Sequence, residues 1–171
     1  MMTQTSRRVE PAGHAMREDL RRVFGHYPSG VAALAATIDH SDVVLVASSF
    51  TVGVSLDPTL VMFAVQRSST TWPILRDAPS IGVSVLSAGQ DHLCRQLSSK
   101  DKSERWKDTP RLRSQGGAVF IDGACVTLEC SIYAEYPAGD HEIVVMEVTG
   151  LEADTDQDPL VFHGSRFRPL G

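Results

Sequence analysis

The apolar residues of this chain are gathered in short runs. The longest uninterrupted runs, Val31–Ala36 and Leu60–Val65, have six residues each. A membrane-spanning helix needs about 20 apolar residues, so no segment is long enough to cross a bilayer. Short runs rich in Val and Ile, bounded by Gly, Pro, Asp and Ser, are typical of β-strands. The expected strands are Val31–Ile38, Val43–Ala47, Leu60–Val65, Ile81–Leu86, Cys125–Tyr133, Ile143–Thr149 and Leu160–His163.

Many of these segments are continuously apolar and do not alternate between apolar and polar residues. Such strands are covered on both faces, here by a barrel interior on one side and by helices or a partner subunit on the other. The chain lacks the long alternation of strands and helices that builds a doubly wound parallel sheet. The pattern therefore predicts a mainly β protein, either a barrel or a sandwich, with a few short helices.

Three helices are expected between or before the strands. The first covers Met16–His26, because Leu20, Val23 and Phe24 share one face at helical spacing. The other two cover Thr71–Asp77, with Thr70 or Thr71 as N-cap, and Ala88–Ser98, where Ser87 and Gln90 have capping-box spacing. Residues 1–16 show no hydrophobic period and are expected to form a flexible N-terminal arm. Residues 17–171 are expected to form one domain, since domains run to roughly 100–200 residues.

Composition excludes several classes of protein. The chain has 16 Lys+Arg against 21 Asp+Glu, a net charge of −5, which argues against a general nucleic-acid binder. The N-terminus lacks the apolar stretch of a secretory signal. Three cysteines are too few for a disulfide framework, and Cys125 and Cys130 point to opposite faces of one expected strand. We therefore expect no metal site, free thiols and a cytoplasmic protein.

Charge is distributed unevenly along the sequence. The segment Lys100–Arg113 has six basic and three acidic residues, whereas Glu135–Asp158 has eight acidic residues and no Lys or Arg. Such runs usually form solvated surfaces. Alternatively, the basic segment attracts a phosphorylated ligand to one patch of the protein.

Two hydroxyl-rich segments follow apolar strands and are candidates for a ligand site. Ser48, Ser49 and Phe50 come directly after one strand, where they could line a pocket or simply mark a fraying strand. Gln66–Thr71 lies between a strand and a helix, and carries four hydroxyls and Arg67. Free N–H groups at a helix N-terminus favour phosphate, although ordinary capping would need only one of those hydroxyls.

The sequence contains few candidates for residues that catalyse by acid–base or nucleophilic chemistry. No serine lies in a GxSxG elbow, and no paired carboxylates have the arrangement of a glycosidase. His141 follows Gly139 and Asp140 in an expected turn and would stand at the mouth of a strand. A lone histidine of this kind is more often structural than catalytic, and His163 is equally ambiguous.

Taken together, several segments resemble the flavin reductase-like family, the short-chain NAD(P)H:flavin oxidoreductases with an FMN-binding split β-barrel of Greek-key type. The segments occur in the family's order and cover roughly residues 20–168. They are Phe24–Gly30, Ser48–Pro58, the strand leading into Arg67-Ser68-Ser69, Val83–Leu86 with Gln90, Leu128-Glu129-Cys130, Gly139-Asp140-His141, and Pro159-Leu160 running to His163.

The resemblance implies a homodimer that binds FMN or FAD near its interface. It implies hydride transfer from NADH or NADPH to that flavin, followed in much of the family by delivery of reduced flavin to a partner monooxygenase. The scarcity of acid–base residues is consistent with this activity, because the cofactors carry the hydride chemistry.

The resemblance also assigns residues to the site. His141 matches the histidine near the nicotinamide and is the implied catalytic residue. The implied flavin-binding residues are Ser48, Ser49, Phe50, Gln66, Arg67, Ser68, Ser69, Thr70, Arg105, Trp106 and Arg166, with Arg105 facing the phosphate.

The sequence departs from the family pattern at a few positions. Val44, Leu45 and Val46 stand where Gly-Met-Thr is usual, which removes a hydroxyl near the flavin. The loop Asp39–Asp42 lacks the usual glycine, and Phe167 replaces a common tyrosine. These changes keep two alternatives open: a non-catalytic flavin-binding module on the same fold, or another split-barrel flavin-dependent oxidoreductase.

Overall fold

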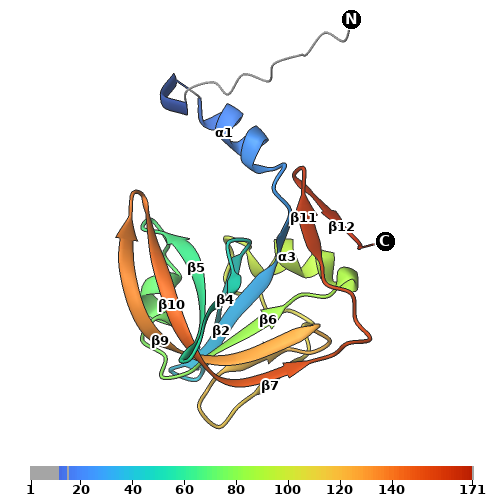
Figure 1. Ribbon diagram of the computed structural model, residues 1–171. Coiled ribbons are helices and arrows are strands. Elements are labelled where there is room, and N and C mark those ends of the chain that lie inside the picture. The colour runs from blue at the N-terminus through green and yellow to red at the C-terminus, as the bar shows by residue number, and fades with distance from the viewer. Residues whose placement is uncertain (1–11, 15, 171) are drawn as a thin grey trace, which may run out of the picture.

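The computed structural model describes residues 12–14 and 16–170 of the chain (Figure 1). The strands are β1 (Ser29–Gly30), β2 (Ala32–Ile38), β3 (Ser41–Ala47), β4 (Thr51–Leu56), β5 (Thr59–Gln66), β6 (Ile81–Val85), β7 (Arg111–Arg113), β8 (Val119–Ile121), β9 (Val126–Ala138), β10 (His141–Ala153), β11 (Val161–His163) and β12 (Arg166–Arg168). The helices are α1 (Arg17–Phe24), α2 (Trp72–Leu75) and α3 (Asp91–Leu97), with 3-10 turns η1 (Ala12–His14) and η2 (Ala88–Gln90).

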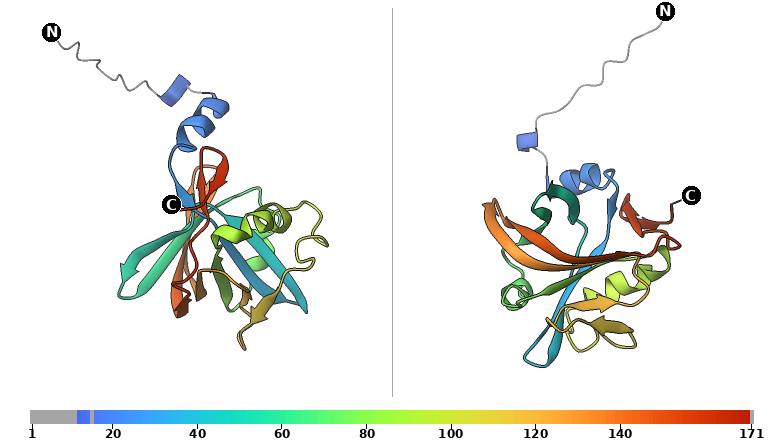
Figure 2. Two further views of the ribbon diagram at one scale, coloured as in Figure 1. Left: turned by 90° about the vertical axis from the view of Figure 1, so that its right-hand side faces the viewer. Right: turned by 60° about the horizontal axis from the view of Figure 1, so that its bottom comes forward.

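Seven of these strands form one antiparallel sheet in the order β3-β2-β6-β9-β10-β5-β4. The sheet curls strongly, so that β4 and β5 swing away from β2 and β3 (Figure 2). A second sheet, β1-β11-β12, pairs the segment that follows α1 with the β11–β12 hairpin near the C-terminus, and β7 and β8 form a separate hairpin. The prediction of a mainly β, split-barrel fold with few helices is confirmed.

Strand β2 is buried on both faces, as its uninterrupted apolar sequence predicts. Ala32, Leu34 and Ala36 pack into the core inside the curled sheet, together with Phe63 and Met146. The residues between them face the opposite way, into a second core. That second core contains Leu93 and Leu97 of α3, and β8 also contributes to it. Helix α3 and β8 therefore cover the outer face of β2 without a second subunit.

The expected helices are present but shorter than predicted. Helix α1 lies inside the predicted range Met16–His26, and α2 has only four residues, Trp72–Leu75. The range Ala88–Ser98 divides into η2 and α3. Within it, the Gln90 side chain accepts a hydrogen bond from the Ser87 backbone nitrogen at 3.1 Å, as capping-box spacing predicts.

Every strand that the apolar runs predict is present, and five further strands were not predicted: β1, β4, β7, β8 and β12. Within the predicted arm, residues 1–11 and 15 lie outside the described residues, and Ala12–His14 forms a 3-10 turn. In the part of the chain that the structure describes, no helix has the length and apolar character needed to cross a membrane.

Candidate active site

A cavity of about 400 Å³ opens where β3 and β5 end and β10 begins. Its walls come from three segments that are far apart in the sequence. The lining residues are Leu45, Val46, Ala47, Ser48, Ser49, Ala64, Val65, Gln66, Ser68, Ser69 and His141. The structure therefore brings together Ser48, Ser49, Gln66, Ser68, Ser69 and His141, which the sequence had singled out separately. We call this cavity the hydroxyl pocket.

Strand pairing places His141 at the pocket. The turn between β9 and β10 contains Gly139 at φ +64°, a conformation that glycine adopts at little cost. His141 begins β10 and pairs directly with Gln66 at the end of β5. The Arg67 backbone nitrogen donates to the Asp140 carbonyl at 3.0 Å, so the two strand ends are held side by side.

The His141 ring is oriented by its neighbour. Its Nδ1 lies 2.7 Å from Oδ1 of Asp140. This hydrogen bond and the imidazole charge lower the pKa of Asp140 below its usual value. Because Nδ1 is held by the carboxylate, Nε2 is the nitrogen that remains for a ligand in the pocket.

The serine hydroxyl groups that line the pocket differ in their hydrogen-bond partners. Ser49 Oγ both donates to the Ala64 carbonyl and accepts from the Ala64 nitrogen, each at 3.0 Å, so it ties the end of β3 to β5. Ser69 Oγ accepts from the nitrogens of Thr71 and Trp72 and caps α2. Thr71 holds the N-cap position of α2, one of the two residues predicted for it, but its side chain makes no capping hydrogen bond and Ser69 supplies that bond instead. Ser48 and Ser68 remain as the hydroxyls best placed for a ligand.

The prediction of an anion site at free N–H groups of α2 is not supported by this geometry, because the helix has four residues and Ser69 occupies its first donors. A positive charge is nevertheless close to the pocket. Arg67 lines an adjoining cavity of about 300 Å³ that shares Gln66 and Ser69 with the hydroxyl pocket. Arg76 and Glu142 also line that cavity, and Arg76 pairs with Glu135.

The remaining predicted residues lie outside the hydroxyl pocket. Phe50 packs against the inner core and Thr70 is exposed. Arg105 donates to Val44, Thr71 and Ser99. The Trp106 indole nitrogen donates to the Asp42 carbonyl at 2.8 Å. Arg166 is exposed on the β11–β12 hairpin, opposite His163.

The arginines of the basic segment Lys100–Arg113 bind other groups of the protein. Arg111 and Arg113 both pair with Asp42, whose side chain is only 3% exposed. Burial raises the pKa of this carboxyl, but hydrogen bonds from Arg113, Thr37 and Arg111 outweigh that effect and lower it to about 2. Two of the cations that could have formed a phosphate patch therefore neutralise one buried carboxylate.

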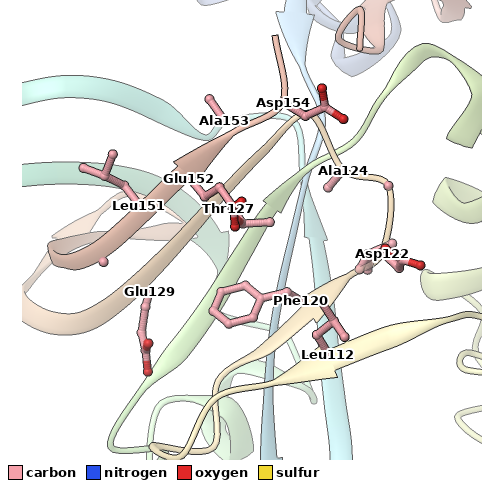
Figure 3. A pocket seen from close by; sticks show the side chains of 13 residues that line it. Leu112, Phe120, Asp122, Ala124, Thr127, Glu129, Leu151, Glu152, Ala153 and Asp154 are labelled. Atoms are coloured by element: carbon pink, nitrogen blue, oxygen red, sulfur yellow. The ribbon is translucent and has the colours of Figure 1, made fainter. Parts of the chain in front are cut away.

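A larger cavity of about 650 Å³ lies at the other end of β10 (Figure 3). Leu112 and Phe120 of the β7–β8 hairpin line it, and Leu151 of β10 lies at its edge. Its four acidic residues are Asp122, Glu129, Glu152 and Asp154, and no Lys, Arg or His is among its described lining residues. This negative lining disfavours phosphorylated ligands, so size alone does not make it the candidate active site.

The sequence did not single out the backbone wall of the hydroxyl pocket. Strand β3 is an edge strand, and the carbonyls of Asp42 and Val44 point away from its partner β2, since they accept from Trp106 and Arg105. Peptide groups two residues apart point the same way, so Val46 presents its N–H and C=O on that side, at the pocket. Only the pairing register of β2 and β3 could have revealed this.

Comparison with known proteins agrees with this fold. Residues 24–171 match the family model described as "Flavin reductase like domain". An NADH-dependent FAD reductase of Streptomyces globisporus is 37% identical over 157 residues, covering 89% of this chain and 85% of that protein. The reductase component of 4-hydroxyphenylacetate 3-monooxygenase from Thermus thermophilus is 30% identical, covering 91% and 97%.

Solved structures show the same relationship. The NADH:FAD oxidoreductase SgcE6 of Streptomyces globisporus, in complex with NAD and FAD fragments, superposes with a TM-score of 0.86 at 32% identity. The match covers 97% of this chain and 98% of that one. The chain belongs to the flavin reductase-like domain family.

Proposed function

We propose that this protein is an NAD(P)H:flavin oxidoreductase that transfers hydride from NADH or NADPH to FMN or FAD. The observation that carries the proposal is the hydroxyl pocket, in which His141, Gln66 and two serine-rich turns converge beside the cation Arg67. Relatives in Streptomyces globisporus and Rhodococcus are described as NADH-dependent flavin reductases, which supports a nicotinamide as the donor.

The residues present fit a flavin. A cavity of about 400 Å³ is within the range of roughly 300–1,000 Å³ for small-molecule sites. The Val46 peptide group offers a donor and an acceptor that match the polar pyrimidine edge of the flavin ring. The side chains of Leu45 and Val46 make that wall apolar, so polar contacts from this wall would come from the main chain. Arg67 would hold the flavin phosphate.

The protein contributes orientation and charge to the reaction. A bound flavin supplies the hydride-accepting ring. His141, with Nδ1 fixed by Asp140, directs Nε2 toward the nicotinamide side of the pocket. Ser49 keeps the ends of β3 and β5 at a fixed separation, which preserves the space between the two reacting rings.

We also propose that the enzyme is a cytoplasmic homodimer that delivers reduced flavin to a monooxygenase. Relatives that are reductase components support this partner.

Strand β4, the outer edge of the large sheet, carries Val52, Val54 and Leu56 at 63%, 40% and 85% exposure. A second copy of the chain would cover this apolar face. Cys94, Cys125 and Cys130 are free thiols, which is typical of a reducing compartment.

Steady-state oxidation of NADH and NADPH with FMN, FAD and riboflavin tests the proposed activity. At least one nicotinamide–flavin pair should be turned over in proportion to enzyme concentration. Flavin binding, seen as quenched flavin fluorescence, without turnover of any pair would instead favour the non-catalytic module that the apolar residues Val44–Val46 keep open.

A further inference from the structure

Strand β3 forms one wall of the hydroxyl pocket, yet it is an edge of the large sheet. The sheet holds it only through β2. On its other side, an edge strand presents a row of peptide groups without strand partners. Apart from the bonds between Ser49 and Ala64 at the end of β3, the position of the pocket wall therefore depends on what holds that free side of β3.

Two consecutive side chains, Arg105 and Trp106, occupy the free side. Arg105 Nη1 donates to the Val44 carbonyl at 3.1 Å, and Trp106 Nε1 donates to the Asp42 carbonyl at 2.8 Å. These carbonyls are two residues apart, so the two side chains act like a short neighbouring strand. The next peptide group in this series is that of Val46, which lines the pocket.

Arg105 also reaches the opposite side of the pocket. The same Nη1 donates at 3.1 Å to Oγ1 of Thr71, which is buried at the start of α2. The turn just before Thr71 contains Ser68 and Ser69, both of which line the pocket. One guanidinium nitrogen thus links β3 to the turn that faces it.

The segment that carries Arg105 is itself fixed. Arg105 Nε donates to the Ser99 carbonyl at 2.7 Å. From α3, the Gln96 amide donates to the carbonyls of Arg105 and Lys107, at 3.2 and 2.6 Å. Since α3 is packed into the outer core through Leu93 and Leu97, Arg105 is anchored to a rigid part of the protein.

We infer that Arg105 is a positioning residue that sets the separation of the two walls of the hydroxyl pocket, and does not act as the ligand of the flavin phosphate. Its Nε and Nη1 donors are engaged by three protein oxygens, and only Nη2 has no partner among the described residues. Arg67, in contrast, makes no side-chain hydrogen bond or ion pair within the described residues, so its charge is available. The inference rests on the proposed flavin site.

The two arginines can be distinguished by comparing FMN with riboflavin, which lacks the phosphate. Arg105→Gln should weaken the binding of both flavins by the same factor, about tenfold, because the hydrogen bonds to Val44 and Thr71 that link the two walls are lost. Arg67→Gln, the matched control, should weaken FMN binding and leave riboflavin binding unchanged. Quenching of flavin fluorescence gives the dissociation constants, and NADH oxidation gives KM and kcat.

A selective loss of FMN binding in Arg105→Gln would overturn the inference. So would unchanged flavin affinity and KM with only a lower Tm, which is the result expected of a residue that merely stabilises the fold. If Arg105→Gln does not fold, Thr71→Val removes one acceptor and keeps the arginine. It should weaken both flavins equally, and unchanged affinity for both would count against the inference. Absence of flavin binding by the wild type would instead refute the proposed function.

Discussion

His141 is half-buried at the rim of the hydroxyl pocket, with its ring held by Asp140. If its Nε2 meets the nicotinamide, His141→Ala should raise the KM for NADH or NADPH, or lower kcat, by roughly tenfold, as expected when one hydrogen bond to a ligand is lost. Flavin affinity should remain near that of the wild type. Steady-state kinetics and flavin quenching on the same preparation measure both quantities.

Asp140→Asn provides the matched test of ring orientation. It keeps the shape of the side chain but removes the charge that holds Nδ1, so it should shift the same nicotinamide constants in the same direction by a smaller factor. A large loss of flavin affinity in His141→Ala would show that the histidine belongs to the flavin side of the pocket.

Asp42 links stability to pH. Its pKa falls from 3.8 to about 2 on folding, so its contribution is present above the unfolded pKa and is lost as pH falls through the folded value. A shift of this size corresponds to about 2 kcal/mol. Asp42→Asn should therefore lower the free energy of unfolding by about that amount at pH 7.

Urea unfolding of both proteins at several pH values measures this effect. The difference between wild type and Asp42→Asn should shrink as pH falls from about 4 to 2, as protonation of the wild-type carboxyl removes its advantage. Asp77→Asn, at an exposed position, should show no comparable difference. A gap between wild type and Asp42→Asn that stays constant down to pH 2 would contradict this account.

Individual site residues were predictable when they were close together in the sequence. Ser48 with Ser49, and Gln66 with Ser68 and Ser69, were singled out in pairs or runs, and all of them line one pocket. What each side chain binds was not predictable, because the partners are remote. Ser49 bonds a residue 15 positions away, and Arg105 bonds one 61 positions away.

At the scale of elements, β6 and β8 approach unusually closely at Gly82. A Cβ at this position would overlap main-chain atoms of Val119, with the Val119 nitrogen only 2.9 Å away. The main chain cannot move aside as a side chain does. Gly82→Ala should therefore lower the free energy of unfolding by about 3 kcal/mol, the upper end of the range of about 1–3 kcal/mol that is typical of overpacked cores. The midpoint of denaturant unfolding measures the change.

Gly89→Ala is the control for this prediction. Nothing lies within 4 Å of a Cβ placed at Gly89, so the substitution should leave stability unchanged or slightly raised. Equal midpoints for the two variants would mean that β8 does not pass as close to β6 as the structure shows.

Longer strands with continuous apolar sequences were predictable, because burial on both faces selects Val, Ile, Leu and Ala along the whole strand. Strand β8 is also apolar and largely buried but was missed, because its three residues are fewer than the roughly four to eight expected of a strand. The missed strands β4, β7 and β12 are exposed at most positions, so their sequences lack this signal. The turn between β2 and β3 was also not predictable from the sequence. Asp39 and His40 adopt φ of +47° and +64°, and the expected glycine is absent.

At the scale of the whole molecule, the exposed apolar edge β4 predicts self-association. Introducing charge there, as in the double variant Val52→Asp and Leu56→Asp, should convert the proposed dimer to monomer with the fold intact. Light scattering coupled to gel filtration measures the mass, and circular dichroism checks the fold. The exposed residue Leu151, at 73% exposure, lies at the acidic cavity, and Leu151→Asp should leave the dimer intact.

A wild-type protein that is monomeric at micromolar concentration would contradict the proposed dimer. Dissociation by Leu151→Asp, with no effect of the β4 substitutions, would place the interface at the acidic cavity instead. Neither result would affect the assignment of the hydroxyl pocket, which is lined by residues of one chain.

Direct observation of hydride transfer tests the central claim. Enzyme, flavin and NADH or NADPH are mixed without oxygen, and the flavin absorbance near 450 nm is followed with time. The account predicts bleaching far faster than in the enzyme-free mixture, and slower bleaching when the transferred hydrogen of the nicotinamide is replaced by deuterium. Bleaching at the uncatalysed rate with FMN, FAD and riboflavin, and with both nicotinamides, would contradict the account.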